Sequence, residues 1–170
     1  MGRTVRERTR ILYPHNRVHQ SKMWHYHVHS SLANAASQGL AIKTGEEQVH
    51  LNFDVAAAGS ARVRLYEGPT VSACTEGTSP MNMNRYKAGS GAAAECSVQI
   101  GASPDVASTA WNQLLAEHHI PGGGKKEPEG GIIKTGAEWI LNQSKTYTIG
   151  ATNLQGTTGG VTIAVEFYED

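Results

Sequence analysis

The sequence predicts an all-β protein built as an antiparallel β-sandwich or jelly roll. Apolar and polar side chains alternate at period two in segment after segment, as expected of strands with one buried face and one wet face. Glycine, proline and small polar residues separate these segments at fairly regular intervals, and no segment carries a long helical pattern. Eight or more short strands joined in this way favour two packed antiparallel sheets.

Length and composition indicate one compact domain. The chain has 170 residues, of which 39% are hydrophobic and 18% charged, and its 19 glycines fall mostly in short turn-like clusters. Its apolar runs are too short to span a membrane, and the N-terminus lacks the apolar core of a signal peptide. We therefore expect a soluble protein made in the cytoplasm. Large apolar residues are few for this length, so association that buries further surface is expected.

Charge is distributed unevenly along a chain whose formal net charge is zero. Residues 1–22 form a basic N-terminal arm with a single acid, whereas the C-terminus is an acidic tail with Glu166, Glu169 and Asp170. Two interpretations of the arm stay open: an ordinary solvated terminus, or a docking arm that orders on an acidic protein surface. Residues 23–170 form the predicted sandwich domain.

The strands in the first half of this domain follow from alternation. Residues 24–29 alternate Trp, Tyr and Val with three histidines, and residues 39–43 form a second short strand. Alternation is strongest in residues 49–55 and 61–66. The short turn Ala58-Gly-Ser60 between these two segments predicts that they pair as a hairpin.

A sharp corner is predicted after Glu67. Gly68 permits a positive φ angle, and Pro69 removes a backbone donor from the ladder. Residues 111–118 fit a helical face as well as a strand, and we interpret them as a strand. The further candidate strands are residues 70–73, 81–86, 94–100, 138–141, 146–152 and 161–168.

Five short motifs, taken in order, carry a resemblance to a known family. They are Leu65-Tyr-Glu-Gly-Pro-Thr-Val-Ser-Ala73, Asn82-Met-Asn-Arg85, the Pro121–Gly124 loop with Gly130-Gly131, Glu138-Trp-Ile-Leu141, and Val165-Glu-Phe-Tyr-Glu169. From about Trp24 to the C-terminus, the chain resembles the head decoration (cement) proteins of tailed bacteriophages. The resemblance implies a jelly-roll β-sandwich that binds the outer surface of the major capsid protein lattice as a homo-oligomer, a trimer rather than a dimer. Its implied place is the outer capsid surface of the virion, where it stabilises the head.

Two regions are predicted to make the contacts. The arm is the first, and the loop region 118–131 is the second, because glycine, proline and charges of both signs suit an exposed excursion. The candidate residues for contact with the capsid or a neighbouring subunit are Arg3, Arg6, Arg8, Arg10, Arg17, Pro121, Gly122, Gly123, Lys125 and Lys126. The motif residues around the corner are assigned a structural role: Glu67, Gly68, Pro69, Asn84 and Arg85.

Three other chemistries compete with this hypothesis. No Ser/His/Asp set or pair of carboxylates occurs at a recognisable spacing, so we expect no enzyme and no cofactor. The basic residues of the arm do not interleave with aromatic residues beyond Tyr13, so we expect no specific nucleic-acid partner. His25, His27 and His29 would share one strand face, where they suit either a cupin-like zinc or nickel site or a wet or interface surface. Trp24, Trp111 and Trp139 suit either a carbohydrate-binding module or core packing. Cys74 and Cys96 are expected to be thiols.

Overall fold

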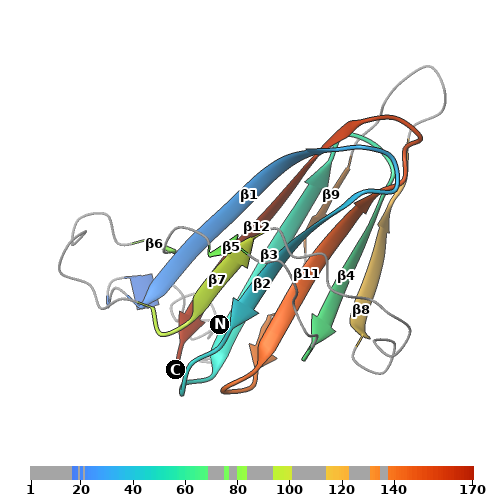
Figure 1. Ribbon diagram of the computed structural model, residues 1–170. Helices are drawn as coiled ribbons and strands as arrows, with labels where there is room; N and C mark the ends of the chain where they lie inside the picture. Colours follow the sequence, from blue (N-terminus) through green and yellow to red (C-terminus); the bar gives the residue numbers. More distant parts are fainter. Residues whose placement is uncertain are drawn as a thin grey trace, which may run out of the picture.

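The computed structural model describes residues 17–18, 20, 22–68, 75–76, 80–83, 94–100, 114–122, 131–134 and 138–170. In these residues the chain forms two antiparallel sheets packed against each other as a β-sandwich (Figure 1). The prediction of an all-β sandwich is therefore confirmed. Within the same residues, no helix is long and apolar enough to span a bilayer.

The first sheet, sheet A, has the strand order β10-β3-β12-β1-β6, and β9 also pairs with β3. Its strands are β1 (Met23–Leu32), β3 (Val49–Ala57), β6 (Met81–Asn82), β9 (Gly131–Lys134), β10 (Trp139–Leu141) and β12 (Gly159–Glu169). The second sheet, sheet B, has the order β5-β7-β2-β11-β4-β8. Its strands are β2 (Ser37–Lys43), β4 (Ala61–Glu67), β5 (Thr75–Glu76), β7 (Ser97–Ile100), β8 (Leu114–Ile120) and β11 (Thr146–Asn153).

Among the described strands, none pairs with its neighbour in sequence. The predicted hairpin is therefore wrong: both strands exist, but β3 belongs to sheet A and β4 to sheet B. The turn Ala58-Gly-Ser60 crosses the sandwich, and the Ala58 amide donates a hydrogen bond to the Gly160 carbonyl at 2.9 Å. Alternation shows that a strand has one buried face, but it does not show which sheet the strand joins.

Three further segments differ from the sequence-based expectation. The loop predicted over residues 118–131 is too long at both ends, because His118–Ile120 belong to β8 and Gly131 begins β9. A short strand, β5, occurs where a polar connection was expected. The strand prediction for 111–118 is confirmed from Leu114 onward, and residues 70–73 lie outside the described residues.

The core fills the space between the two sheets. Its largest fully buried side chains include Phe53, Phe167 and Ile149. Trp24 is 3% exposed, and its ring stacks on that of Phe167 with centroids 5.8 Å apart. Cys96 is a free, buried thiol whose pKa is raised by burial, while Cys74 lies outside the described residues.

Candidate interaction surface

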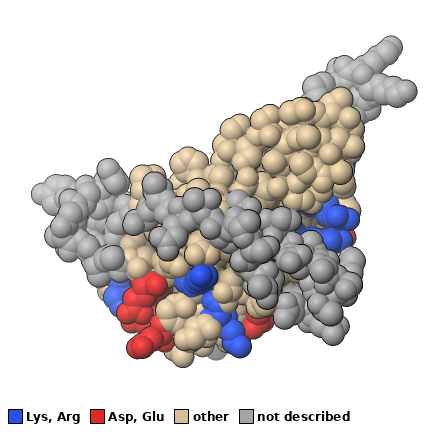
Figure 2. Space-filling model, viewed as in Figure 1, with Lys and Arg blue, Asp and Glu red and all other residues tan. Residues whose placement is uncertain are grey.

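The two ends of the sandwich differ in charge. One end is built from the turns at residues 33–36, 58–60 and 154–158 with the adjoining strand ends, and we call it the uncharged end. No Lys, Arg, Asp or Glu occurs in residues 23–42, 55–61 or 146–165, which include these turns and strand ends. Figure 2 shows the same contrast, with tan atoms toward the upper right and charged side chains gathered toward the lower end. Depletion of charged residues is typical of the core of a protein interface.

Asn153 ties the turns of the uncharged end together. Its side chain is 3% exposed, and Nδ2 donates hydrogen bonds to the Leu32 carbonyl at 2.8 Å and the Thr157 carbonyl at 2.7 Å, with the Ala33 carbonyl at 3.3 Å. Its Oδ1 accepts from the Gln155 amide at 3.0 Å. One buried amide therefore satisfies groups from the β1–β2 turn and the β11–β12 turn together.

Backbone contacts fix the same turns further. The Ala35 amide donates to the Asn153 carbonyl at 2.8 Å, and the Leu154 amide donates to the Ser60 carbonyl at 2.8 Å. Ala35 itself has a φ angle of 63°, a backbone conformation that residues other than glycine rarely adopt unless their surroundings impose it. The uncharged end is thus held in one shape before any partner arrives, which lowers the ordering cost of binding.

The predicted contact loop starts from this end. Pro121 and Gly122 are exposed and follow β8 directly. A Cβ placed on Gly122 would lie 3.0 Å from the Ser60 Cβ, so Gly122 lies against the β3–β4 turn. Leu154, 39% exposed, adds an apolar side chain nearby. Gly123, Lys125 and Lys126 lie outside the described residues.

The root of the N-terminal arm lies at the opposite, charged end. Arg17 is buried, forms an ion pair with Asp170, and places its guanidinium carbon 5.7 Å from the centre of the Tyr168 ring. Tyr168 stacks on His50 at 4.5 Å between centroids, and His50 Nδ1 lies 3.2 Å from a Glu138 carboxylate oxygen. Of the arm's candidate residues, Arg17 is therefore engaged by its own chain; Arg3, Arg6, Arg8 and Arg10 lie outside the described residues.

The motif corner also lies at the charged end. β4 ends at Glu67, and Gly68 takes a φ angle of 69°, which glycine adopts without strain. The Gly68 amide donates to the Thr146 carbonyl at 2.6 Å. These contacts give the described part of the corner a structural role, whereas Pro69, Asn84 and Arg85 lie outside the described residues.

A buried carboxylate anchors the last strand at this end. Glu169 is 4% exposed and accepts hydrogen bonds from the amides of Cys96 at 2.7 Å and Glu95 at 3.2 Å. Burial raises the pKa of Glu169, and the two amide donors oppose that rise. The carboxylate thereby connects β12 of sheet A to the segment that leads into β7 of sheet B.

The residues of the two alternative chemistries lie apart from the uncharged end's turns. His25, His27 and His29 face outward on β1, as predicted; the first two rings lie 5.4 Å apart, and His29 Nδ1 is 2.9 Å from Thr162 Oγ1. Within the described residues, no three His, Cys, Asp or Glu side chains form a group able to hold a metal ion. Trp24 is in the core, Trp139 packs partly buried against it, and Trp111 lies outside the described residues.

Comparison with known proteins gives no assignment: neither the protein-family models nor the curated proteins include a match to this sequence. The uncharged end itself was not predicted from the sequence. The sequence does contain an indication of it, because residues 23–42 and 146–165 are long stretches without charge in a chain with this charge content. Only the strand pairing shows that these stretches meet at one end of the molecule.

Proposed function

We propose that the protein is a capsid decoration protein of a tailed bacteriophage, which binds the outer surface of the major capsid protein lattice as a homo-oligomer and stabilises the head. The observation that carries this proposal is the uncharged end: a rigid, charge-free surface made of three turns. A surface of this composition is suited to lie against another protein, since no charge must be desolvated there. The motif resemblance between residues 65 and 169 supplies the identity of the partner.

The strand order supports the jelly-roll part of the proposal. β1, β12, β3 and β10 are successive in sheet A, and β2, β11, β4 and β8 are successive in sheet B. A jelly roll has eight strands in two packed sheets, with the first strand beside the last, and is common among viral capsid proteins. The order of these eight strands within the two six-stranded sheets supports this assignment.

The positions of the two contact regions support a bridging role. The uncharged end with Pro121 and Gly122 lies at one end of the strands, and Arg17 of the arm lies at the other. With β12 at 11 residues, the two ends are separated by about 36 Å along the strands. A protein that contacts one capsid subunit by its uncharged end and another by its arm would hold the two together.

A binding assay with heads that lack this protein tests the proposal. Ala58 is exposed in the β3–β4 turn, so Ala58→Glu places a charge on the uncharged end without filling the core. We expect wild-type protein to co-sediment with heads at a saturating stoichiometry and A58E to bind at least about tenfold more weakly, because the new charge must be desolvated. Gln143→Glu, which adds the same charge at an exposed position of the charged end, is the matched control and should bind as wild type.

Two further results bear on the proposal. Heads saturated with the protein should withstand a higher temperature or a lower external osmotic pressure before they release DNA, because separating capsid subunits would then break the added contacts. A wild-type protein that binds no head, or an A58E variant that binds as tightly as Q143E, would contradict the proposed function or the assigned surface respectively. Light scattering of the free protein measures the proposed homo-oligomer.

A further inference from the structure

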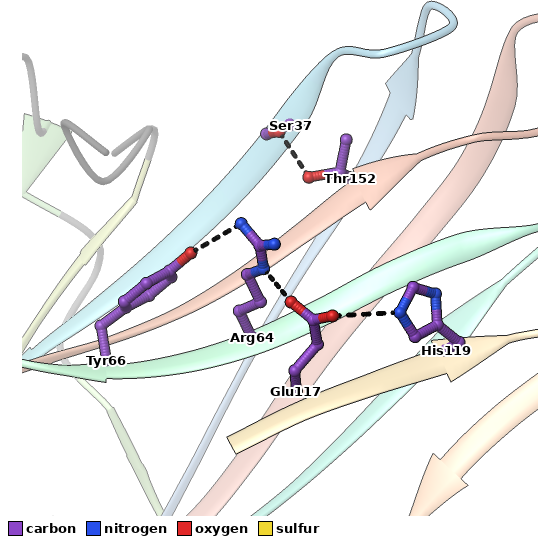
Figure 3. A network of polar contacts seen from close by, with 6 residues as sticks. All are labelled: Ser37, Arg64, Tyr66, Glu117, His119 and Thr152. Carbon is purple, nitrogen blue, oxygen red and sulfur yellow. Dashed lines mark hydrogen bonds and ion pairs between the residues drawn. The ribbon is translucent and has the colours of Figure 1, made fainter. Parts of the chain in front are cut away.

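A polar network covers part of the outer face of sheet B, next to the uncharged end (Figure 3). The Arg64 guanidinium on β4 forms an ion pair with Glu117 on β8 and donates to the Tyr66 hydroxyl at 3.3 Å. His119 Nε2 lies 3.1 Å from the other Glu117 oxygen. The hydrogen bond from Arg64 lowers the pKa of Glu117, so this carboxylate is charged. Both of its oxygens have partners, in Arg64 and His119.

Arg62 shares this face but not this network. By register it lies between Thr152 of β11 and His119 of β8, two residues closer to the uncharged end than Arg64. Its Nε atom is buried and has no hydrogen-bond partner, and no described residue forms an ion pair with its guanidinium. A buried donor on a charged group is costly to leave unpaired, and such exceptions call for an explanation.

The groups around Arg62 are suited to an anion. In the same cross-strand row, the hydroxyls of Ser37 and Thr152 lie 2.8 Å apart and either can donate. Arg64 and Glu117 neutralise each other, so Arg62 contributes one uncompensated positive charge. One excess charge matches a monoanion such as a carboxylate, whose two oxygens fit the guanidinium geometry.

We propose that Arg62 is a binding site for an Asp or Glu side chain of the partner protein, seated at the rim of the uncharged end. Here the two terminal nitrogens of the guanidinium take the two carboxylate oxygens, while the buried Nε stays within the domain. The identity of the partner protein rests on the proposed function, whereas the preference of the site for a carboxylate is independent of that function. A rim of paired charges around a charge-free centre is the usual arrangement of a protein interface.

The chemistry is tested on the isolated, full-length protein by following the ¹⁵N–¹H signal of the Arg62 side-chain Nε. The signal is assigned by its loss in Arg62→Gln and is followed as sodium acetate replaces sodium chloride at constant ionic strength. We expect a saturable shift of the Arg62 signal with acetate and little change in the Arg64 signal, whose donor is already occupied by Glu117. Sodium phosphate is the second arm. A larger response to phosphate, or no response to acetate beyond that to chloride, would overturn the carboxylate assignment.

The place of the site in the interface is tested by head binding. R62Q should bind heads at least about tenfold more weakly than wild type, and Arg62→Lys should recover only part of the loss because lysine lacks the fork. Lys43→Gln is the matched control: Lys43 is exposed on sheet B at the other end of β2, and its loss should leave binding unchanged. If R62Q binds as tightly as K43Q while A58E remains defective, this inference fails and the proposed function stands. If wild type binds no head, the proposed function fails, and the acetate titration still decides the chemistry of the site.

Discussion

Removal of the Asn153 side chain tests the claim that one buried amide holds the uncharged end in shape. Asn153→Ala removes an Nδ2 group that serves three carbonyls and an Oδ1 acceptor that serves the Gln155 amide. A typical hydrogen bond contributes about 1 kcal/mol net, and buried groups left unpaired add to the loss. Because the 3.3 Å contact is the weakest of the four, we expect the free energy of unfolding to fall by about 3 kcal/mol.

Urea denaturation followed by tryptophan fluorescence measures this change. For a domain of this size, a loss of about 3 kcal/mol corresponds to a melting temperature lower by about 6–12 °C. Asn34→Ala is the matched control, since Asn34 Oδ1 accepts one exposed hydrogen bond from the Gly156 amide at 3.0 Å and its removal should have a small effect.

Asn153→Asp separates the donor from the acceptor role. Aspartate keeps an oxygen for the Gln155 amide but directs a carboxylate at three carbonyl oxygens, so it should destabilise at least as much as alanine. In N153A, the Gln155 amide should also lose protection in hydrogen exchange relative to the core strands. A loss below about 1 kcal/mol in N153A, or an N153D variant as stable as wild type, would refute the role assigned to this side chain.

Four other predictions concern the charged end, the network and the core. Because the carboxyl of Glu169 has a raised pKa in the native state, it binds its proton more tightly there than in the unfolded chain. The free energy of unfolding should therefore fall as pH rises from about 4.5 through the raised native pKa. Urea titrations at several pH values should show a smaller fall in Glu169→Gln. Glu117 has a lowered pKa and acts in the opposite sense. Its contribution to the free energy of unfolding is present above its ordinary pKa and is lost as pH falls through the lower native pKa, so Glu117→Gln should lose less stability at acid pH than wild type. Trp24→Ala should cost about 3–5 kcal/mol by denaturation, whereas Ile140→Ala, at a side chain 59% exposed, should change stability by less than about 0.5 kcal/mol. The Cys96 thiol should resist a thiol reagent in the native state and react on unfolding, which a Cys74→Ala background isolates.

The long strands were predictable from the sequence because apolar and polar residues alternate in each of them as its buried and exposed faces do. In β3 and β12, buried and partly buried residues alternate almost without exception, and so do apolar and polar residues in the sequence. The pairing of β3 with β4 was predicted wrongly because a short glycine-containing turn fits a hairpin and an inter-sheet connection equally well. β9 escaped prediction because the glycine pair at 130–131 indicates a loop, and nothing local reveals that β3 offers these residues a partner.

The candidate surface was less predictable than the fold because it depends on which turns meet. The loop at Pro121 was predicted as a contact, but its neighbour Ser60 is distant in sequence. Alternation in residues 61–66 puts Arg62 and Arg64 on the same strand face, and the sequence gives no sign that Arg64 has an ion-pair partner in Glu117 while Arg62 Nε has no hydrogen-bond partner. That difference arises from the register between β4 and β8.

The strand order has a consequence for how the protein is made. β11 lies between β2 and β4, and β12 lies between β1 and β3, so the ribosome makes the central strands of both sheets after most of their neighbours. Until then, β1 to β4 have no pairing with one another, and their edges stay open to association with other chains. Native contacts between residues this distant in sequence are slow to form, which predicts folding in milliseconds to seconds, beginning only after β11 and β12 have been made. Nascent and truncated chains, more than mature ones, are therefore the form of this protein most prone to aggregate.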